Sequence, residues 1–257
     1  MKLTIATILV AACAGVSASA ATFDFGDAAD DFKTTYGFEA TWDQAVAKDG
    51  SIASDGGISI TDISATYHNA ATGKLQSADP FLDADTSTTL ASNGRLLKNA
   101  GLGVCHKGFV DTTANNTAEK YDAHGGVSTC ATGGGSYIID KGDDNLTLSE
   151  TLKITFSAFV EIAELLIYDG GHNQIAYREA INISTDGINY KTYGAIGASV
   201  LGLDGLGASN MFWFQTTGSK PQIYITGMTV NEVPLPAAGW MLLAGVGAIA
   251  AARRKKS

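Results

Sequence analysis

Two cysteines, Cys105 and Cys130, offer the clearest covalent chemistry in this 257-residue chain. The third, Cys13, lies in an N-terminal segment that we expect to be removed, so an even pair remains. In an oxidising compartment this pair predicts a disulfide, which would close a loop rich in small and polar residues. The alternative is a metal site that adds His106 and His124 to the two thiols. That site would require the adjacent side chains of Cys105 and His106 to converge on one ion, which is rare.

Oxygen ligands gather in one short segment, where Asp140, Asp143, Asp144 and Asn145 share a turn. Carboxylate and amide oxygens are the groups that Ca²⁺ prefers, so the three aspartates are candidate calcium ligands. Their spacing does not match the twelve-residue loop of an EF-hand, and the same residue types also form ordinary turns. Calcium is therefore the only cofactor that the sequence suggests.

Catalytic signatures are absent from the sequence. It contains no G-x-S-x-G, H-E-x-x-H, P-loop or G-x-G-x-x-G pattern, and its four histidines lie in polar or glycine-rich stretches. Glu161 and Glu164 have the residue type of a glycosidase acid and base. They lie in a run of alternating apolar residues, where we expect both carboxylates to face solvent. We therefore predict no catalytic residues and a protein that is not an enzyme.

The first 20 residues have the pattern of a secretory signal peptide. Lys2 provides the positive start, the run from Leu3 to Val16 is apolar, and small residues precede a cleavage site between Ala20 and Ala21. A lipid-attachment motif ending at Cys13 is the alternative. Cleavage after Ala20 predicts an exported protein that folds where disulfides form.

The last 25 residues, 233–257, combine three features that set a topology. The apolar run 237–252 predicts a short transmembrane helix, and the basic tail after it predicts a cytoplasmic C-terminus. That tail consists of Arg253, Arg254, Lys255 and Lys256. Two prolines keep the segment before the helix extended, a shape that fits a protease cleft. Its residues are Val233, Pro234, Leu235, Pro236 and Ala237.

This tail resembles the VPLPA variant of the PEP-CTERM sorting signals of exported bacterial proteins. The resemblance implies that a membrane-embedded exosortase recognises the proline motif and removes the tail. It further implies a transient stay in the inner membrane and then release to the cell surface or extracellular matrix. Leu235 replaces the central glutamate of the commoner motif, which leaves the exosortase subtype open. An ordinary permanent membrane anchor is the alternative.

Residues 21–232 are predicted to form one β-rich domain. This region holds 26 acidic and 12 basic residues, a net charge of −14 that argues against nucleic acid as a partner. Short runs of alternating apolar residues, separated by Gly- and Asp-rich turns, predict an antiparallel β-sandwich of jelly-roll-like type. The runs are 22–25, 58–67, 152–156, 162–168, 181–183, 211–214 and 223–225. No long amphipathic helix is predicted, and residues 79–89 are expected to form a loop or a short helix.

The sequence favours a non-enzymatic protein of the cell surface or of a polysaccharide-containing matrix. A carbohydrate-binding module is the alternative, since residues 183–190 resemble a hairpin of galactose-binding-like sandwiches. Four aromatic residues are candidates for contacting sugars, although large rings also fill sandwich cores. They are Trp42, Tyr190, Tyr193 and Trp213. A glycan-active hydrolase is a third class, which would need convergent carboxylates or a histidine-centred triad.

Overall fold

The computed structural model describes residues 19–36, 40–69, 73–85, 99–105, 146, 150–169, 180–196, 199–217 and 223–234. The described strands and helices belong to one unit, Ser19–Val233. The helices are α1 (Phe25–Tyr36), α2 (Trp42–Lys48), and the 3₁₀ turns η1 (Gly50–Ala53) and η2 (Leu203–Gly205). The strands are β1 (Ala20–Asp24), β2 (Ala40–Thr41), β3 (Ser54–Asp55), β4 (Ile58–Asn69), β5 (Lys74–Asp85), β6 (Asn99–Cys105), β7 (Glu150–Asp169), β8 (Ala180–Ser184), β9 (Lys191–Ile196), β10 (Ser199–Val200), β11 (Ser209–Thr217) and β12 (Ile223–Glu232).

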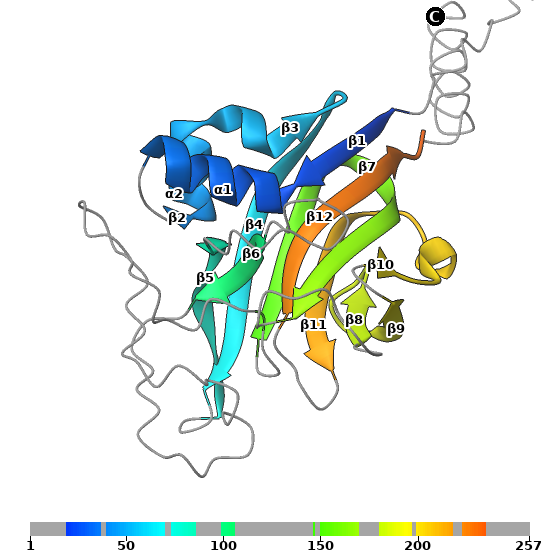
Figure 1. Cartoon of the computed structure of the whole chain (residues 1–257). Helices are drawn as coiled ribbons and strands as arrows, with labels where there is room; N and C mark the ends of the chain where they lie inside the picture. The colour runs from blue at the N-terminus through cyan, green and yellow to red at the C-terminus, as the bar shows by residue number, and fades with distance from the viewer. Residues whose placement is uncertain are drawn as a thin grey trace, which may run out of the picture. The chain divides into compact units, whose positions relative to one another are not determined.

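The long strand β7 organises the sheet by pairing differently along its length (Figure 1). Its first part, from Glu150 to Phe156, pairs with β4, and the residues from Leu152 to Val160 pair with β11 on the other side. Its second part, from Val160 to Asp169, pairs with β12. One strand therefore joins two sets of neighbours into a single hydrogen-bonded network.

All described strand pairings are antiparallel, so the prediction of a mainly β, antiparallel domain is confirmed. The strand order is β1-β12-β6-β5-β4-β7-β10-β9-β8-β11, with additional pairings of β7 to β12 and to β11. These extra pairings close two circuits that share β7. One contains β4, β5, β6 and β12, and the other contains β8, β9, β10 and β11. A separation into two jelly-roll-like layers stays a prediction.

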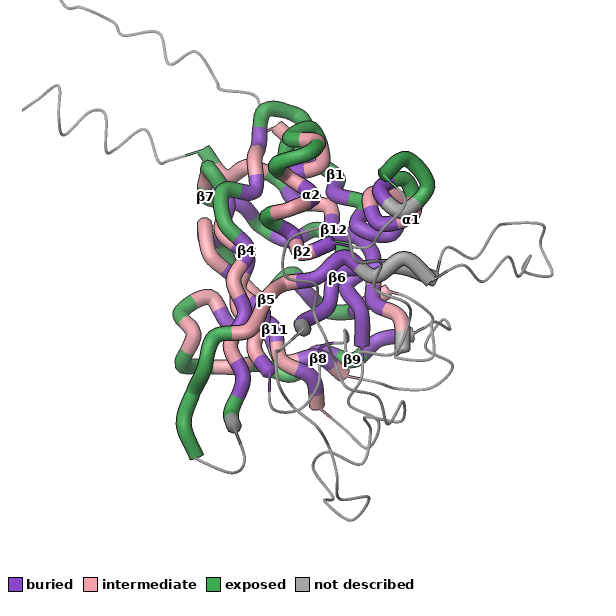
Figure 2. The backbone as a smooth tube through the Cα atoms, turned by 90° about the vertical axis from the view of Figure 1, so that its left-hand side faces the viewer, coloured by how far each residue is buried: buried purple, intermediate pink, exposed green. Residues whose placement is uncertain are grey.

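Alternation of side chains accounts for the buried interior. In β4 the residues Ile58 and Ile60 are buried, and after one extra residue at Thr61 the alternation resumes at Ile63. This extra residue is a β-bulge, because the register against β7 shifts between Ile60 and Asp62. The buried positions of the strands face a common interior, whereas the start of β5 is exposed (Figure 2).

Aromatic rings connect distant parts of this core. The Phe156 ring on β7 lies 5.9 Å from the Phe23 ring on β1 and 6.1 Å from the Phe212 ring on β11, between ring centroids. All three side chains are at most 3% exposed. Burial of such rings stabilises the fold by removing large apolar surfaces from water. The N-terminal strand is thus tied to the centre of the sheet.

Helix α1 was not predicted from the sequence, where we expected no long amphipathic helix; it is amphipathic and has 12 residues. The carboxylate of Asp24 accepts a 2.8 Å hydrogen bond from the Asp27 amide, which caps the first turn. Phe25, Ala29 and Phe32 then recur at helical spacing and are all buried. One side of α1 is accordingly buried and the other is exposed (Figure 2).

Helix α2 was not predicted from the sequence, and residues 79–85 differ from their prediction. α2 begins with a capping box, in which the Gln44 amide donates to Thr41 Oγ1 and the Thr41 amide donates to Gln44 Oε1. The Thr-x-x-Gln spacing is visible in the sequence and could have revealed this helix. Residues 79–85, expected to be a loop or short helix, belong instead to β5. Pairing with β6 from Asp79 to Asp85 overrides their weak strand propensity.

Candidate functional site

One face of the sheet carries polar side chains in register across four strands. Ser64 on β4 lies opposite Lys153 on β7, and Lys153 in turn lies opposite Trp213 on β11. On each of these strands, the residues two positions before and after point to the same side of the sheet, because side chains alternate between the two sides of a strand. We call this set the polar face. Its residues are Asp62, Ser64, Thr66, Thr151, Lys153, Thr155, Asn182, Met211, Trp213 and Gln215.

The side chains of the polar face are accessible to solvent, whereas the residues that alternate with them along the strands form the core. Every one of the ten side chains is exposed or half-buried. Leu152, Ile154, Phe212 and Phe214, which point to the opposite side, are completely buried. The sequence reveals the alternation of each strand, but only the register shows that these polar residues form one surface.

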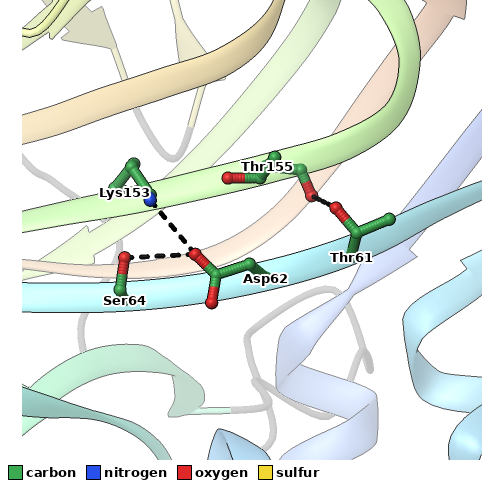
Figure 3. A network of polar contacts seen from close by, with 5 residues as sticks. All are labelled: Thr61, Asp62, Ser64, Lys153 and Thr155. Carbon is green, nitrogen blue, oxygen red and sulfur yellow. Dashed lines mark hydrogen bonds and ion pairs between the residues drawn. The ribbon is translucent and has the colours of Figure 1, made fainter.

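An ion pair marks the β4 side of the polar face (Figure 3). The Lys153 Nζ atom lies 3.2 Å from Asp62 Oδ2, and Ser64 Oγ donates to the same carboxylate oxygen over 3.3 Å. At the adjacent bulge, Thr61 Oγ1 donates to the main-chain oxygen of Thr155 over 3.2 Å. The two charged side chains are only partly buried, so this ion pair adds little to stability. Both charges remain able to contact a ligand.

The indole of Trp213 lies at the middle of the polar face and is braced by a neighbouring turn. An added Cβ atom at Gly187 would lie only 3.0 Å from Trp213 Cε2, so the glycine backbone packs closely against the ring. The φ angle of Gly187 is +73°, a conformation that favours glycine. The turn after β8 therefore fixes the position of a half-buried indole.

Asp186 holds this turn in shape. Its Oδ1 atom accepts hydrogen bonds from the amides of Asn189 and Ile188 at 2.7 and 2.8 Å, and from Ser184 Oγ at 2.8 Å. The Asn189 side-chain amide donates to Oδ2 at 2.7 Å. These donors, with Asn189 contributing most, hold the pKa of the Asp186 carboxyl well below its usual value. The turn whose Gly187 packs against Trp213 thus contains a stable carboxylate.

Tyr190 reaches the polar face from the end of the same turn. Partial burial raises the pKa of its phenol, and the Thr151 side chain hydrogen-bonds to it. Thr151 Oγ1 also accepts a 2.8 Å hydrogen bond from Gln215 Nε2. On the adjacent strand pair, Thr192 Oγ1 donates to Asn182 Oδ1 over 2.7 Å. Two aromatic rings thus share the surface with amides and hydroxyls whose orientations are fixed.

The four aromatic candidates divide into two groups. Trp213 and Tyr190 lie at the polar face and are half-buried. Trp42 and Tyr193 are each only 3% exposed, so these two candidates fill the core, which was the alternative for all four rings, and do not contact a sugar. Trp42 packs edge-on against Phe25 at the start of α1, and Tyr193 faces the core from β9. Alternation along β9 would have assigned Tyr193 to the core if its register had been known.

The remaining candidate residues do not converge in the described part of the chain. Glu161 and Glu164 are both exposed on β7, as expected from the alternating pattern. His68 is exposed on β4. No group of three or more His, Cys, Asp or Glu residues that could hold a metal ion occurs among the described residues.

Several predicted sites lie outside the described residues. The backbone of Cys105 ends β6, but its side chain and the whole of Cys130 are outside, so the disulfide stays a prediction. The calcium candidates Asp140, Asp143 and Asp144 are outside as well. So are the apolar segments 1–18 and 237–252, and within the described ranges no helix has the length and apolar character needed to cross a membrane.

The two predicted processing junctions lie side by side. β1 pairs with β12 from Ala20 opposite Asn231 to Asp24 opposite Gly227 (Figure 1). The Glu232 amide donates to the Ser19 oxygen over 2.7 Å. The predicted signal-cleavage site at Ala20 and Ala21 therefore lies opposite Asn231 and Val230, which precede the start of the predicted sorting motif at Val233 in the sequence. Leu235, Pro236, Ala237 and the basic tail lie outside the described residues.

Comparison with known proteins assigns this chain to no family. No family model matches the sequence, and no curated protein matches it either.

Proposed function

We propose that this is a non-enzymatic exported protein that binds a neutral polysaccharide of the cell surface or extracellular matrix through the polar face. In this proposal the ectodomain is a jelly-roll-like antiparallel sandwich delivered by the N-terminal signal and trimmed by an exosortase at the VPLPA motif. The observation that carries the proposal is the braced, half-buried indole of Trp213 in the middle of a row of hydrogen-bonding side chains.

This combination of groups suits a sugar chain. An aromatic ring stacks against the C–H groups of a pyranose face, while amides, hydroxyls and carboxylates bond to its hydroxyl groups. Trp213 and Tyr190 can supply the rings, and Gln215, Asn182 and Asp62 can supply polar contacts. Because these side chains are already fixed by their neighbours, binding would order few additional groups.

Charge favours a neutral polysaccharide over an anionic one. Residues 21–232 carry a net charge of −14, which would repel a polyanion such as an acidic exopolysaccharide. On the polar face itself Lys153 is paired with Asp62, so it provides no uncompensated positive charge there. A neutral glucan or galactan is not repelled by the net negative charge and needs no unpaired positive charge on the polar face.

The binding experiment uses the mature protein secreted by its host and a panel of neutral and acidic polysaccharides, in affinity electrophoresis. Trp213→Ala and Tyr190→Ala are expected to weaken binding about ten-fold or more, because each removes a stacking ring. Tyr36→Ala is the matched control, since Tyr36 is an exposed aromatic on α1. Failure to bind any neutral polysaccharide, or equal binding by all three variants, would contradict the proposal.

Export and tail processing are tested separately, by mass spectrometry of the protein from its native host. The proposal predicts a mature N-terminus at Ala21 and loss of the basic residues Arg253 to Lys256. A mature chain that still ends at Ser257 would contradict exosortase processing and favour a permanent membrane anchor. The outcome does not depend on which sugar is bound.

A further inference from the structure

The N-terminal and C-terminal processing sites meet on the same pair of strands. The last main-chain hydrogen bond of the β1–β12 ladder joins the Glu232 amide to the Ser19 oxygen at 2.7 Å. Ser19 precedes the predicted signal cleavage, whereas Glu232 directly precedes the predicted sorting motif. One residue of the signal peptide therefore holds the backbone just before the predicted sorting motif, in addition to the contacts that β12 makes with β7.

We propose that removal of the signal peptide loosens the stem of the sorting motif, so that the two processing steps occur in a fixed order. The inference rests on the proposed export and tail processing. Signal cleavage adds water across the Ala20–Ala21 peptide bond, which leaves a carboxylate on Ala20 and a free α-amino group on Ala21. Ser19 departs with the signal peptide, and the Glu232 amide loses its acceptor.

Ser19 and Ala20 contact a second part of the protein besides β12. Ser19 Oγ donates a hydrogen bond to the Gly56 oxygen in the turn between β3 and β4. An added Cβ atom at Gly56 would lie 2.2 Å from the Ala20 oxygen, so the two backbones are in close contact. All of these contacts exist only while the signal peptide is attached. Cleavage removes them together.

The rest of β1 stays in place after cleavage. Ala21 and Phe23 are 1% and 3% exposed, and the pairs from Ala21 opposite Val230 to Asp24 opposite Gly227 do not involve the removed residues. The Thr22 amide also keeps its 2.7 Å hydrogen bond to Asp55 Oδ2. Cleavage is therefore expected to release the β1 side of Glu232, whose other side stays paired with Val160 on β7, without unfolding the domain.

The same geometry requires the signal to be cut first. In the docked strand the Ala20–Ala21 bond lies between β12 and the turn at Gly56, and the Ala21 side chain is buried. A peptidase binds its substrate as an extended segment with free main-chain groups, which docked β1 does not offer. Signal cleavage must then precede docking of β1, so a cleaved chain folds without the Ser19 acceptor and its stem is held less tightly than the stem of an uncut chain.

The variant Ala20→Phe tests the order by blocking signal cleavage, because a large residue replaces the small one that the site needs. Ala20 is exposed, so the substitution does not disturb the core. Thr22→Phe is the matched control on the same exposed side of β1. Hydrogen exchange is measured by mass spectrometry on full chains purified from the host in detergent, and both chain ends are identified by mass.

The Glu232 amide is expected to exchange roughly five-fold faster in the cleaved wild-type and Thr22→Phe proteins than in Ala20→Phe, the ratio that one hydrogen bond supports. Val233 is the internal reference, because its amide donates to the Phe159 oxygen at 2.8 Å and neither residue is removed by signal cleavage. Equal exchange at Glu232, or a wild-type chain that keeps residues 1–20, would overturn the inference. Ala20→Phe is also expected to retain its tail.

A second variant separates the hydrogen bond from the extra membrane anchor of an uncut signal. Glu232→Pro removes the donor, so in the Ala20→Phe background it should restore tail removal. Glu232→Pro alone, with a cleavable signal, controls for recognition of the motif. If it is processed normally but the double variant keeps its tail, the inference fails. If instead wild-type keeps its tail while Glu232 exchange still differs, exosortase processing fails and the coupling of the ends stands.

Discussion

Gly187 packs directly against the indole of Trp213, with 3.0 Å between the position of a Cβ at residue 187 and Trp213 Cε2. The contact joins a turn after β8 to β11, one of the two inner strands of the polar face. It also explains why residue 187 lacks a side chain, since φ is +73° there and the ring fills the space. The orientation of the aromatic group that we propose to stack on sugar depends on this turn.

Gly187→Ala is expected to destabilise the domain by about 1–2 kcal/mol through its positive φ, and by more where the ring must move. Denaturant unfolding gives the stability, and polysaccharide binding should weaken with it. Gly194→Ala is the control, because a Cβ on Gly194 meets nothing within 4 Å and no positive φ is involved. Equal stability of the two variants would contradict the packing described for Gly187.

Asp186→Asn is expected to destabilise the turn at neutral pH, since an amide accepts hydrogen bonds less strongly than a carboxylate. The folded-state pKa of Asp186 lies below its ordinary value of 3.8. The wild-type advantage is therefore complete above about pH 5, and it shrinks as the pH falls below 3.8 through the folded-state pKa. Unfolding curves from pH 7 to pH 3 measure this trend, with Asp204→Asn as control. A difference that grows on acidification would refute it.

Phe156→Ala is expected to cost about 3–5 kcal/mol, because Phe156 is buried between the rings of β1 and β11. Three residues further on, Phe159 is 47% exposed, so Phe159→Ala should change stability by about 0.5 kcal/mol or less. Chemical denaturation of both variants provides the comparison. Similar losses for the two would mean that Phe156 is not at the centre of the core.

Lys153→Gln is expected to lower stability by less than about 1 kcal/mol, since the ion pair with Asp62 is partly exposed. Any loss should disappear in concentrated salt, which screens exposed charges. Polysaccharide affinity should fall more clearly than stability, because Lys153 lies beside Trp213 on the polar face. Unchanged affinity would remove Lys153 from the proposed contact surface without affecting the role of Trp213.

The sequence alone was enough to predict the strands whose apolar residues alternate. Residues 58–67, 162–168 and 211–214 lie in β4, β7 and β11, since side chains on opposite faces of a strand meet different surroundings. It did not predict α1, although Phe25, Ala29 and Phe32 have helical spacing. The alternating run 22–25 was assigned to a strand, whereas Phe25 begins the helix. The cap from Asp24 and burial against the sheet stabilise that helix.

Sequence patterns determined that the chain is a β-rich domain with an acidic middle and two distinctive ends, because alternation, charge and short motifs are local properties. Only the tertiary structure decided which residues share a surface. Strand register placed Lys153 beside Trp213 and brought Ser19 to Glu232, and packing buried Tyr193 and Trp42 in the interior. Pairing between strands far apart in the chain depends on the mutual burial of whole faces, which no single segment specifies.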